Sequence, residues 1–206
     1  MTDITNTKDY IEPFNGKEAL ALREAIETRK LEVDLYWRRA SYFWTLSTVA
    51  FTGFFALQAS KESPPTSLVI VSCIGFVFAL AWLLASRGAK HWQANWEMQV
   101  EMLEDSVIGP LFKTNSKPEG SVWNLFKSYP FSVTKINQLL SLFLAIVWLA
   151  LILQSLSQAN FGFTGAFTVT SVVLIATVVF TILMFVMGQS SVDERRGVAM
   201  TRRTRD

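Results

Sequence analysis

Long stretches without a charged side chain divide the sequence into alternating apolar and polar segments. Residues 40–60 and 63–86 contain no Asp, Glu, Lys or Arg, and neither does the longer stretch 136–192. The hydrocarbon core of a bilayer is about 30 Å thick, so a helix of roughly 20 mostly apolar residues can cross it. Each of the first two stretches is therefore long enough for one membrane-spanning helix, and the third is long enough for two.

The breaks between these stretches predict how the helices are connected. "KESPPTS" (61–67) contains two prolines, which end a helix, and "NFGFTG" (160–165) contains two glycines. A soluble helical protein is the alternative, but soluble helices average about 11 residues, far fewer than these runs. We therefore predict an all-α polytopic membrane protein whose four transmembrane helices form two hairpins. The predicted spans are 42–59, 67–86, 138–157 and 166–188, so the hairpins cover 42–86 and 138–188.

Polar segments flank the two predicted hairpins. Residues 1–14 contain few large apolar groups and are predicted to be flexible. Asn15, with Glu18 three residues later, has the spacing of a capping box, so a helix is expected over 15–41 that continues into the first span. The remaining segments are a central one over 87–137, with a helix over 89–107 that ends before Gly109 and Pro110, and a basic tail over 189–206.

The distribution of Lys and Arg predicts the orientation of the chain. Seven of these residues precede the first span, six lie in the central segment and five in the tail, whereas the two short hairpin loops hold one and none. Positive residues collect on the cytoplasmic side, so both termini and the central segment are expected there. Membrane lipids are the expected neighbours of the basic tail. No nucleic-acid partner is expected, because nothing else forms a basic patch.

Candidate chemistry centres on His91, the single histidine, which lies close to Glu97, Glu101 and Glu104. At about 100° per residue, the three glutamates cluster on one flank of a helix and His91 lies on the other. Cys73 is the single cysteine and lies in a predicted span, so it offers no second metal ligand. Phosphate-binding, nucleophile-elbow and zinc-protease motifs are absent from the sequence. We therefore predict no enzyme, no cofactor and no metal site, with the glutamates as a solvated acidic edge or as partners of Arg or Lys in the N-terminal helix.

An apolar stripe on the helix over 89–107 predicts an assembly face. The members of this stripe recur at helical spacing. Trp37, on the first helix, is a further aromatic residue that we assign to the assembly face. Trp and Met are enriched at the cores of protein interfaces. The predicted assembly residues are Trp37, Trp92, Trp96, Val100, Leu103 and Val107.

A second stripe, of hydroxyl side chains, lies in the first span. Ser41, Thr45, Thr48 and Thr52 recur at spacings of four, three and four and therefore share one face. A neutral pore lining is one interpretation. Helix packing is the favoured one, because small hydroxyl residues allow close approach and bond back to their own helix.

Two segments resemble a known family. The pattern "RKLEVDLYWRRASYFW" (29–44), a proline-closed first hairpin and "SRGAKHWQANWEMQVEMLEDSVIGPLFKT" (86–114) are similar to the RipA-like octameric membrane proteins of the bacterial inner membrane. The resemblance implies a cyclic homo-oligomer of eight copies. It says little about biochemical activity.

We therefore predict a homo-oligomeric bacterial inner-membrane protein of the structural or scaffold type, with a cytoplasmic assembly region. Two alternatives stay open. One is an oligomeric channel with a hydroxyl-lined path, and the other is a signalling or defence protein that acts through a cytoplasmic partner.

Overall fold

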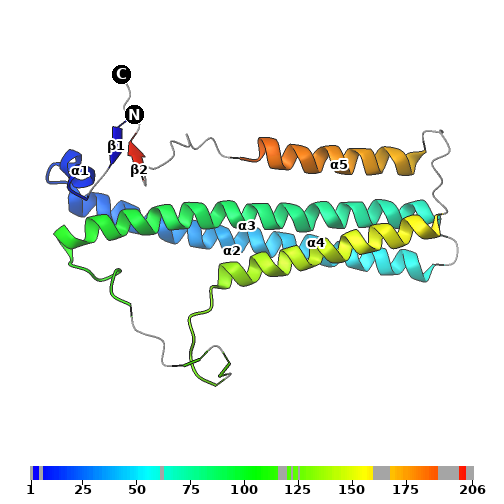
Figure 1. Ribbon diagram of the computed structural model, residues 1–206, viewed down its shortest axis with the longest axis horizontal. Coiled ribbons are helices and arrows are strands. Elements are labelled where there is room, and N and C mark those ends of the chain that lie inside the picture. The colour runs from blue at the N-terminus through cyan, green and yellow to red at the C-terminus, as the bar shows by residue number, and fades with distance from the viewer. Residues whose placement is uncertain are drawn as a thin grey trace. The chain divides into compact units, whose positions relative to one another are not determined.

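The computed structural model of the chain describes residues 2–4, 7–60, 63–115, 120–121, 123–124, 126–159, 168–189 and 200–202. Within these residues the fold is all-α, as predicted (Figure 1). The helices are α1 (Thr7–Ile11), the 3-10 helix η1 (Glu12–Phe14), α2 (Glu18–Ala59), α3 (Pro65–Val107), α4 (Val133–Gln158) and α5 (Val169–Met187). Two three-residue strands, β1 (Thr2–Ile4) and β2 (Met200–Arg202), pair antiparallel.

Four of these helices are long and apolar enough to cross a membrane: α2, α3, α4 and α5. Each predicted span except the last lies entirely within one of them, and α5 begins three residues after the predicted start of the fourth span. Ser132 caps the start of α4, because its side chain accepts a hydrogen bond from the Lys135 backbone N–H at 3.3 Å. The chain is a multi-pass membrane protein.

Helices α2 and α3 are longer than any bilayer requires. They contain 42 and 43 residues, and at 1.5 Å per residue each is about 64 Å long. The predicted second span and the predicted helix over 89–107 are thus one helix, since no proline interrupts the chain between Pro65 and Pro110. Pro65 is the first residue of α3, where a missing N–H costs nothing.

The N-terminal region differs from its prediction. Helix α2 begins at Glu18 and not at Asn15, because Asn15 takes a left-handed conformation (φ 44°) that closes η1. The Glu18 carboxylate accepts from the Gly16 N–H at 3.0 Å. Residues 7–14, predicted to be flexible, form α1 and η1, and the Tyr10 side chain there is buried with its hydroxyl 3.0 Å from Gln99 Oε1.

Two compact units make up the chain. The charged unit comprises Met1–Leu35, Lys90–Pro130 and Ser191–Asp206, and the membrane unit comprises Tyr36–Ala89 and Phe131–Ser190. Every acidic residue except Glu62 belongs to the charged unit. Helices α2 and α3 both extend over the two units, so each unit contains one part of α2 and one part of α3.

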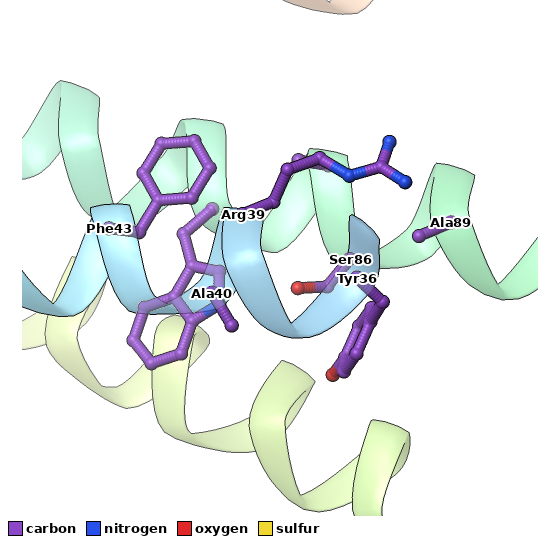
Figure 2. A pocket seen from close by; sticks show the side chains of 8 residues that line it. Tyr36, Arg39, Ala40, Phe43, Ser86 and Ala89 are labelled. Carbon is purple, nitrogen blue, oxygen red and sulfur yellow. The ribbon is translucent and has the colours of Figure 1, made fainter. Parts of the chain in front are cut away.

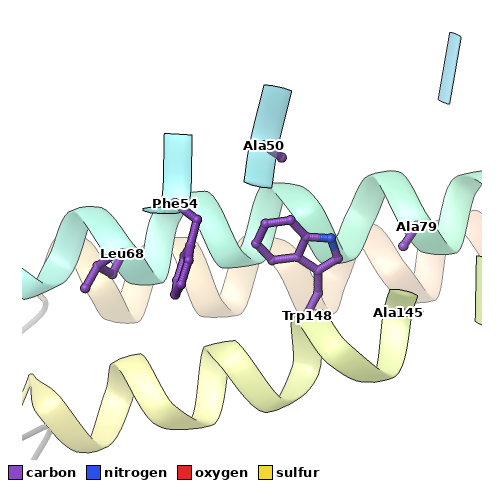
Figure 3. Packing of buried hydrophobic residues seen from close by; sticks show 6 residues of the cluster. All are labelled: Ala50, Phe54, Leu68, Ala79, Ala145 and Trp148. Carbon is purple, nitrogen blue, oxygen red and sulfur yellow. The ribbon is translucent and has the colours of Figure 1, made fainter. Parts of the chain in front are cut away.

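The membrane unit is built around the Trp148 indole of α4, which is fully buried. Ala50 and Phe54 of α2 and Leu68 and Ala79 of α3 pack in the same cluster (Figure 3). A second cluster joins α3 and α4 to α5 through side chains on all three helices: Val69, Cys73, Ile152, Val173 and Leu174. Helix α5 is the least covered of the four membrane-spanning helices, with Thr170 as its one buried residue.

Hydrogen bonds join the helices at one end of the membrane unit. Asn137 Nδ2 donates to the Tyr36 hydroxyl at 2.8 Å, and both side chains are buried. Gln138 Nε2 lies 3.4 Å from the Ser86 carbonyl oxygen. These contacts hold the start of α4 against α2 and α3.

Replacing Tyr36 with phenylalanine is expected to lower the free energy of unfolding by about 1–2 kcal/mol, because it leaves the buried Asn137 amide without its acceptor. Thermal unfolding of the purified protein measures the change. Tyr42→Phe is the matched control, since the Tyr42 side chain is 69% exposed. Equal effects of the two substitutions would contradict the assignment.

Candidate assembly surface

The charged unit has its own apolar core. Leu22 and Ala25 of α2 pack against Val100 and Leu103 of α3, and Tyr10 of α1 joins them. Partly buried side chains surround this cluster, among them Trp96, Met102 and Phe112. The parts of α2 and α3 that belong to this unit thus form a packed pair and not two independent helices.

Charged side chains link the two helices beside this core. Arg29 Nη2 of α2 lies 3.9 Å from Glu97 Oε1 of α3, and Lys90 Nζ lies 3.4 Å from Glu97 Oε2. The Arg29 guanidinium carbon also lies 5.6 Å from the centre of the Phe112 ring. These groups are a third or more exposed, so each ion pair contributes at most about 1 kcal/mol. The sequence predicted that these acids pair with a basic residue of the N-terminal helix, and Arg29 pairs in this way with Glu97 of the same chain.

Glu104 corrects the prediction of a solvated acidic edge. Its side chain is fully buried, and its two carboxylate oxygens accept from the backbone N–H groups of Phe112 and Lys113 at 2.6 and 3.0 Å. Gly109, with φ 78°, provides the left-handed turn that brings this segment back to the helix. The carboxylate thus holds the chain that follows α3 against the helix end.

His91 does not meet the glutamates, as its helical position predicts. Its exposed ring packs edge-on against Trp92, with the two ring centres 5.5 Å apart. Among the described residues there is no cluster of three or more His, Cys, Asp and Glu side chains that could hold a metal ion.

The structure divides the predicted assembly stripe into two groups. Val100 and Leu103 are 1% exposed and belong to the core of the charged unit, and Trp96 packs against that core. Trp92 and Val107 remain exposed, at 42% and 37%. Most of the stripe therefore packs α3 against α2 of the same chain. Only Trp92 and Val107, at the two ends of the stripe, remain accessible to another molecule. Trp37, in the membrane unit, is 41% exposed.

Further apolar side chains of the charged unit are exposed, and some were missed from sequence. Leu20 and Leu31 of α2 are 51% and 55% exposed, and they share a face because eleven residues make just over three turns. Their signal was the recurrence of leucine among charged neighbours. We call the following residues the exposed apolar set of the charged unit: Leu20, Leu31, Val33, Trp92, Val107, Ile108, Leu111, Trp123 and Phe126.

The hydroxyl stripe of α2 is exposed on this chain, and its donors are used within the helix. Thr45 donates to the Ser41 carbonyl at 3.0 Å and Thr52 to the Thr48 carbonyl at 2.9 Å. Ser41 and Thr48 bond in the same way to the carbonyls of Trp37 and Trp44. Because no other described element of the chain covers the stripe, helix packing and the pore lining both stay predictions.

Comparison with known proteins matches the chain to a family. The sequence model of the octameric membrane protein family (8xMP) matches residues 19–157, which run from the start of α2 to the last turn of α4 and do not include α5. No curated protein and no solved structure matches the chain.

Proposed function

The chain belongs to the octameric membrane protein family, and we propose that it acts as a homo-oligomeric scaffold of the bacterial inner membrane, assembled as a ring. One observation carries the proposal, which is the exposed apolar set of the charged unit. The scaffold carries no catalytic step and needs no cofactor.

Lipid cannot cover this set. The charged unit holds all the acidic residues of the chain except Glu62, and the cost of moving so many charges into hydrocarbon keeps it in water. Monomeric soluble proteins rarely expose large contiguous apolar patches. Identical chains that form a closed ring can cover such side chains with the same contact on every copy.

The distribution of Lys and Arg supports the orientation we propose. The two hairpin loops hold Lys61 alone, whereas the segments before, between and after the hairpins hold the other Lys and Arg residues. We therefore place the charged unit and both termini in the cytoplasm. In this orientation the contacts between copies form on the cytoplasmic side of the membrane.

Replacing Trp92 and Leu31 together with alanine is expected to weaken the octamer roughly tenfold or more in dissociation constant, because truncating central apolar interface residues commonly costs about 2 kcal/mol. Native mass spectrometry of the purified protein over a concentration series measures the distribution of oligomers. The thermal midpoint of the dissociated chain is expected to stay unchanged, since both side chains are exposed on one chain.

Trp96→Ala is the control for this experiment. Trp96 packs against the core of the charged unit, so its truncation is expected to lower the stability of the single chain. An octamer that persists unchanged in the Trp92 and Leu31 double variant would show that the exposed apolar set is not the interface.

The channel and the signalling protein remain alternatives to the scaffold. The hydroxyl stripe is the feature that a channel would use, and the hydroxyls bond to their own helix. A signalling role requires a cytoplasmic partner, which the exposed apolar set could bind in place of a second copy. Purification of the intact oligomer from membranes, with or without a second protein, tests the signalling alternative, and ion conductance of the oligomer in a planar bilayer tests the channel.

A further inference from the structure

Two aromatic side chains are almost fully exposed on the segment that follows α3. Trp123 is 90% exposed and Phe126 is 99% exposed, the highest values among the large apolar residues that the structure describes. An open hollow of about 410 Å³ lies beside the two rings, and Ser121 and Asn124 complete its lining. A leucine side chain is much smaller than this volume, so the hollow has room for side chains from another element.

Backbone turns hold the two rings in place and add a positive charge beside them. The Asn124 side chain accepts a hydrogen bond from the Phe126 N–H at 3.1 Å, and the Asn124 N–H donates to the Ser121 carbonyl at 3.0 Å. Lys127 comes directly after Phe126, and its side chain is exposed. The hollow is therefore an aromatic surface with a cation at its edge.

The space between α2 and α3 in the membrane unit is closed by comparison. Side chains of both helices line it, Ala40 and Trp82 among them, and leave no room for a water molecule (Figure 2). The Trp82 side chain there is 1% exposed. A side chain of another molecule can thus enter the hollow beside Trp123 but not this space.

An exposed face of α2 has the complementary composition. Its members recur at spacings of four, three and four, which places them on one side of the helix: Leu20, Glu24, Glu27 and Leu31. All four side chains are exposed. Leu22 and Ala25, which pack against α3, lie on the opposite side of α2. We call the four exposed residues the outer face of α2.

Charge and polarity indicate that the hollow and the outer face of α2 fit each other. The outer face carries two carboxylates between two leucines, whereas the hollow offers two aromatic rings and a lysine. Both surfaces belong to the charged unit, and both are exposed on one chain. Identical copies each present both surfaces, so a contact between the two different surfaces repeats from copy to copy until a ring closes.

We propose that in the octamer Leu31 of each copy enters the hollow between Trp123 and Phe126 of the next copy, with Lys127 of that next copy against Glu27. This inference rests on the proposed function, because it names the partners within the interface that the scaffold needs. An apolar anchor in an aromatic pocket supplies affinity, and the charges at its rim fix which surfaces meet. The contact gives the ring a direction, since the outer face of α2 meets the hollow of one neighbour only.

Zero-length cross-linking tests this contact in the purified full-length octamer. A carbodiimide joins a carboxylate to a lysine amine only when the two groups touch, and mass spectrometry of the digest is expected to find Glu27 joined to Lys127. In octamers that mix equal amounts of isotope-labelled and unlabelled chains, about half of these links are expected to join a labelled to an unlabelled peptide. Links that only ever join peptides of the same label would place the contact within one chain and overturn the proposal.

Charge exchange tests the pairing in a second way. Glu27→Lys and Lys127→Glu are each expected to raise the dissociation constant of the octamer several-fold, because an attraction becomes a repulsion. The two changes together are expected to return that constant to within about twofold of its original value. Lys8→Glu makes the same change of charge at another exposed lysine and is expected not to rescue Glu27→Lys. Equal rescue by Lys8→Glu would overturn the specific pairing in favour of a general effect of net charge.

The outcomes separate this contact from the scaffold itself. A wild-type octamer without a link from Glu27 to Lys127 would overturn the contact and leave the scaffold in place, whereas wild-type protein that forms no octamer would overturn both. Lipid is the other occupant that the aromatic rings could meet. Quenching by brominated lipid that is present in the wild type and absent in Trp123→Phe would assign the hollow to the bilayer and overturn the proposal.

Discussion

Replacing Gly75 with alanine is expected to destabilise the membrane unit by about 3 kcal/mol, the upper end of the cost of overpacking a filled core. A Cβ atom at Gly75 of α3 would lie 2.2 Å from Cε2 of Trp148 and 2.4 Å from Cδ2. The indole has little room to move, because it is fully buried and stacks on Phe51 with ring centres 4.3 Å apart, while Phe54 meets it edge-on at 6.0 Å. Either α3 and α4 separate or the aromatic cluster is disrupted.

Thermal unfolding of the purified protein measures this effect, and Gly53→Ala is its control. Gly53 also lies in a membrane helix, but an added Cβ there meets no atom within 4 Å. Alanine at Gly53 is expected to raise the free energy of unfolding by less than about 1 kcal/mol. In the Gly75→Ala background, Trp148→Phe is expected to restore part of the loss, because the smaller ring leaves space for the new methyl group. A Gly75→Ala protein as stable as Gly53→Ala would refute the close approach of α3 and α4.

Replacing Glu104 with alanine is expected to cost about 3 kcal/mol in the charged unit. Two hydrogen bonds to a charged acceptor are lost at once, and the N–H groups of Phe112 and Lys113 lose the partner that holds them. The segment after Gly109 is then free to leave the helix, although the contact between Lys113 and Asp105 remains. Hydrogen exchange at the amides of Phe112 and Lys113 is expected to accelerate in step with the loss of stability.

Glu101→Ala is the matched control for Glu104→Ala. It removes the same carboxylate one turn earlier on α3, where the side chain is exposed, and is expected to change stability by no more than about 0.5 kcal/mol. Glu104→Gln is expected to fall between the two, since its carbonyl oxygen can still accept one of the two N–H groups. Unchanged exchange at Phe112 and Lys113 in Glu104→Ala would mean that the carboxylate does not hold the segment.

Sequence reasoning was most successful where a local rule applies. A membrane span must be continuously apolar over a fixed length, so the charge-free stretches alone predicted the four spanning helices. The family resemblance, which depended on two short segments, is confirmed by the match over 19–157.

Sequence reasoning was less successful where the role of a side chain depends on which residues pack against it in the folded chain. The spacing of Val100 and Leu103 showed that they share a face of α3, but not that α2 of the same chain covers that face. Glu104 looked like one of three solvated acids because its partners are backbone N–H groups, which carry no residue-type signature. The start of α2 at Glu18 was missed because Asn15 closes η1 in a left-handed conformation, which a capping pattern does not reveal.

The sequence by itself therefore determined the membrane-crossing helices and the family, because each depends on composition along a continuous segment, while the predicted second hairpin loop (160–165) lies outside the described residues. Only the tertiary structure decided that Gly75 makes room for Trp148, which is 73 residues further along the chain. It also decided which margins of the apolar stripe stay open. These features depend on how two helices pack, and helical periodicity specifies a face without specifying what lies against it.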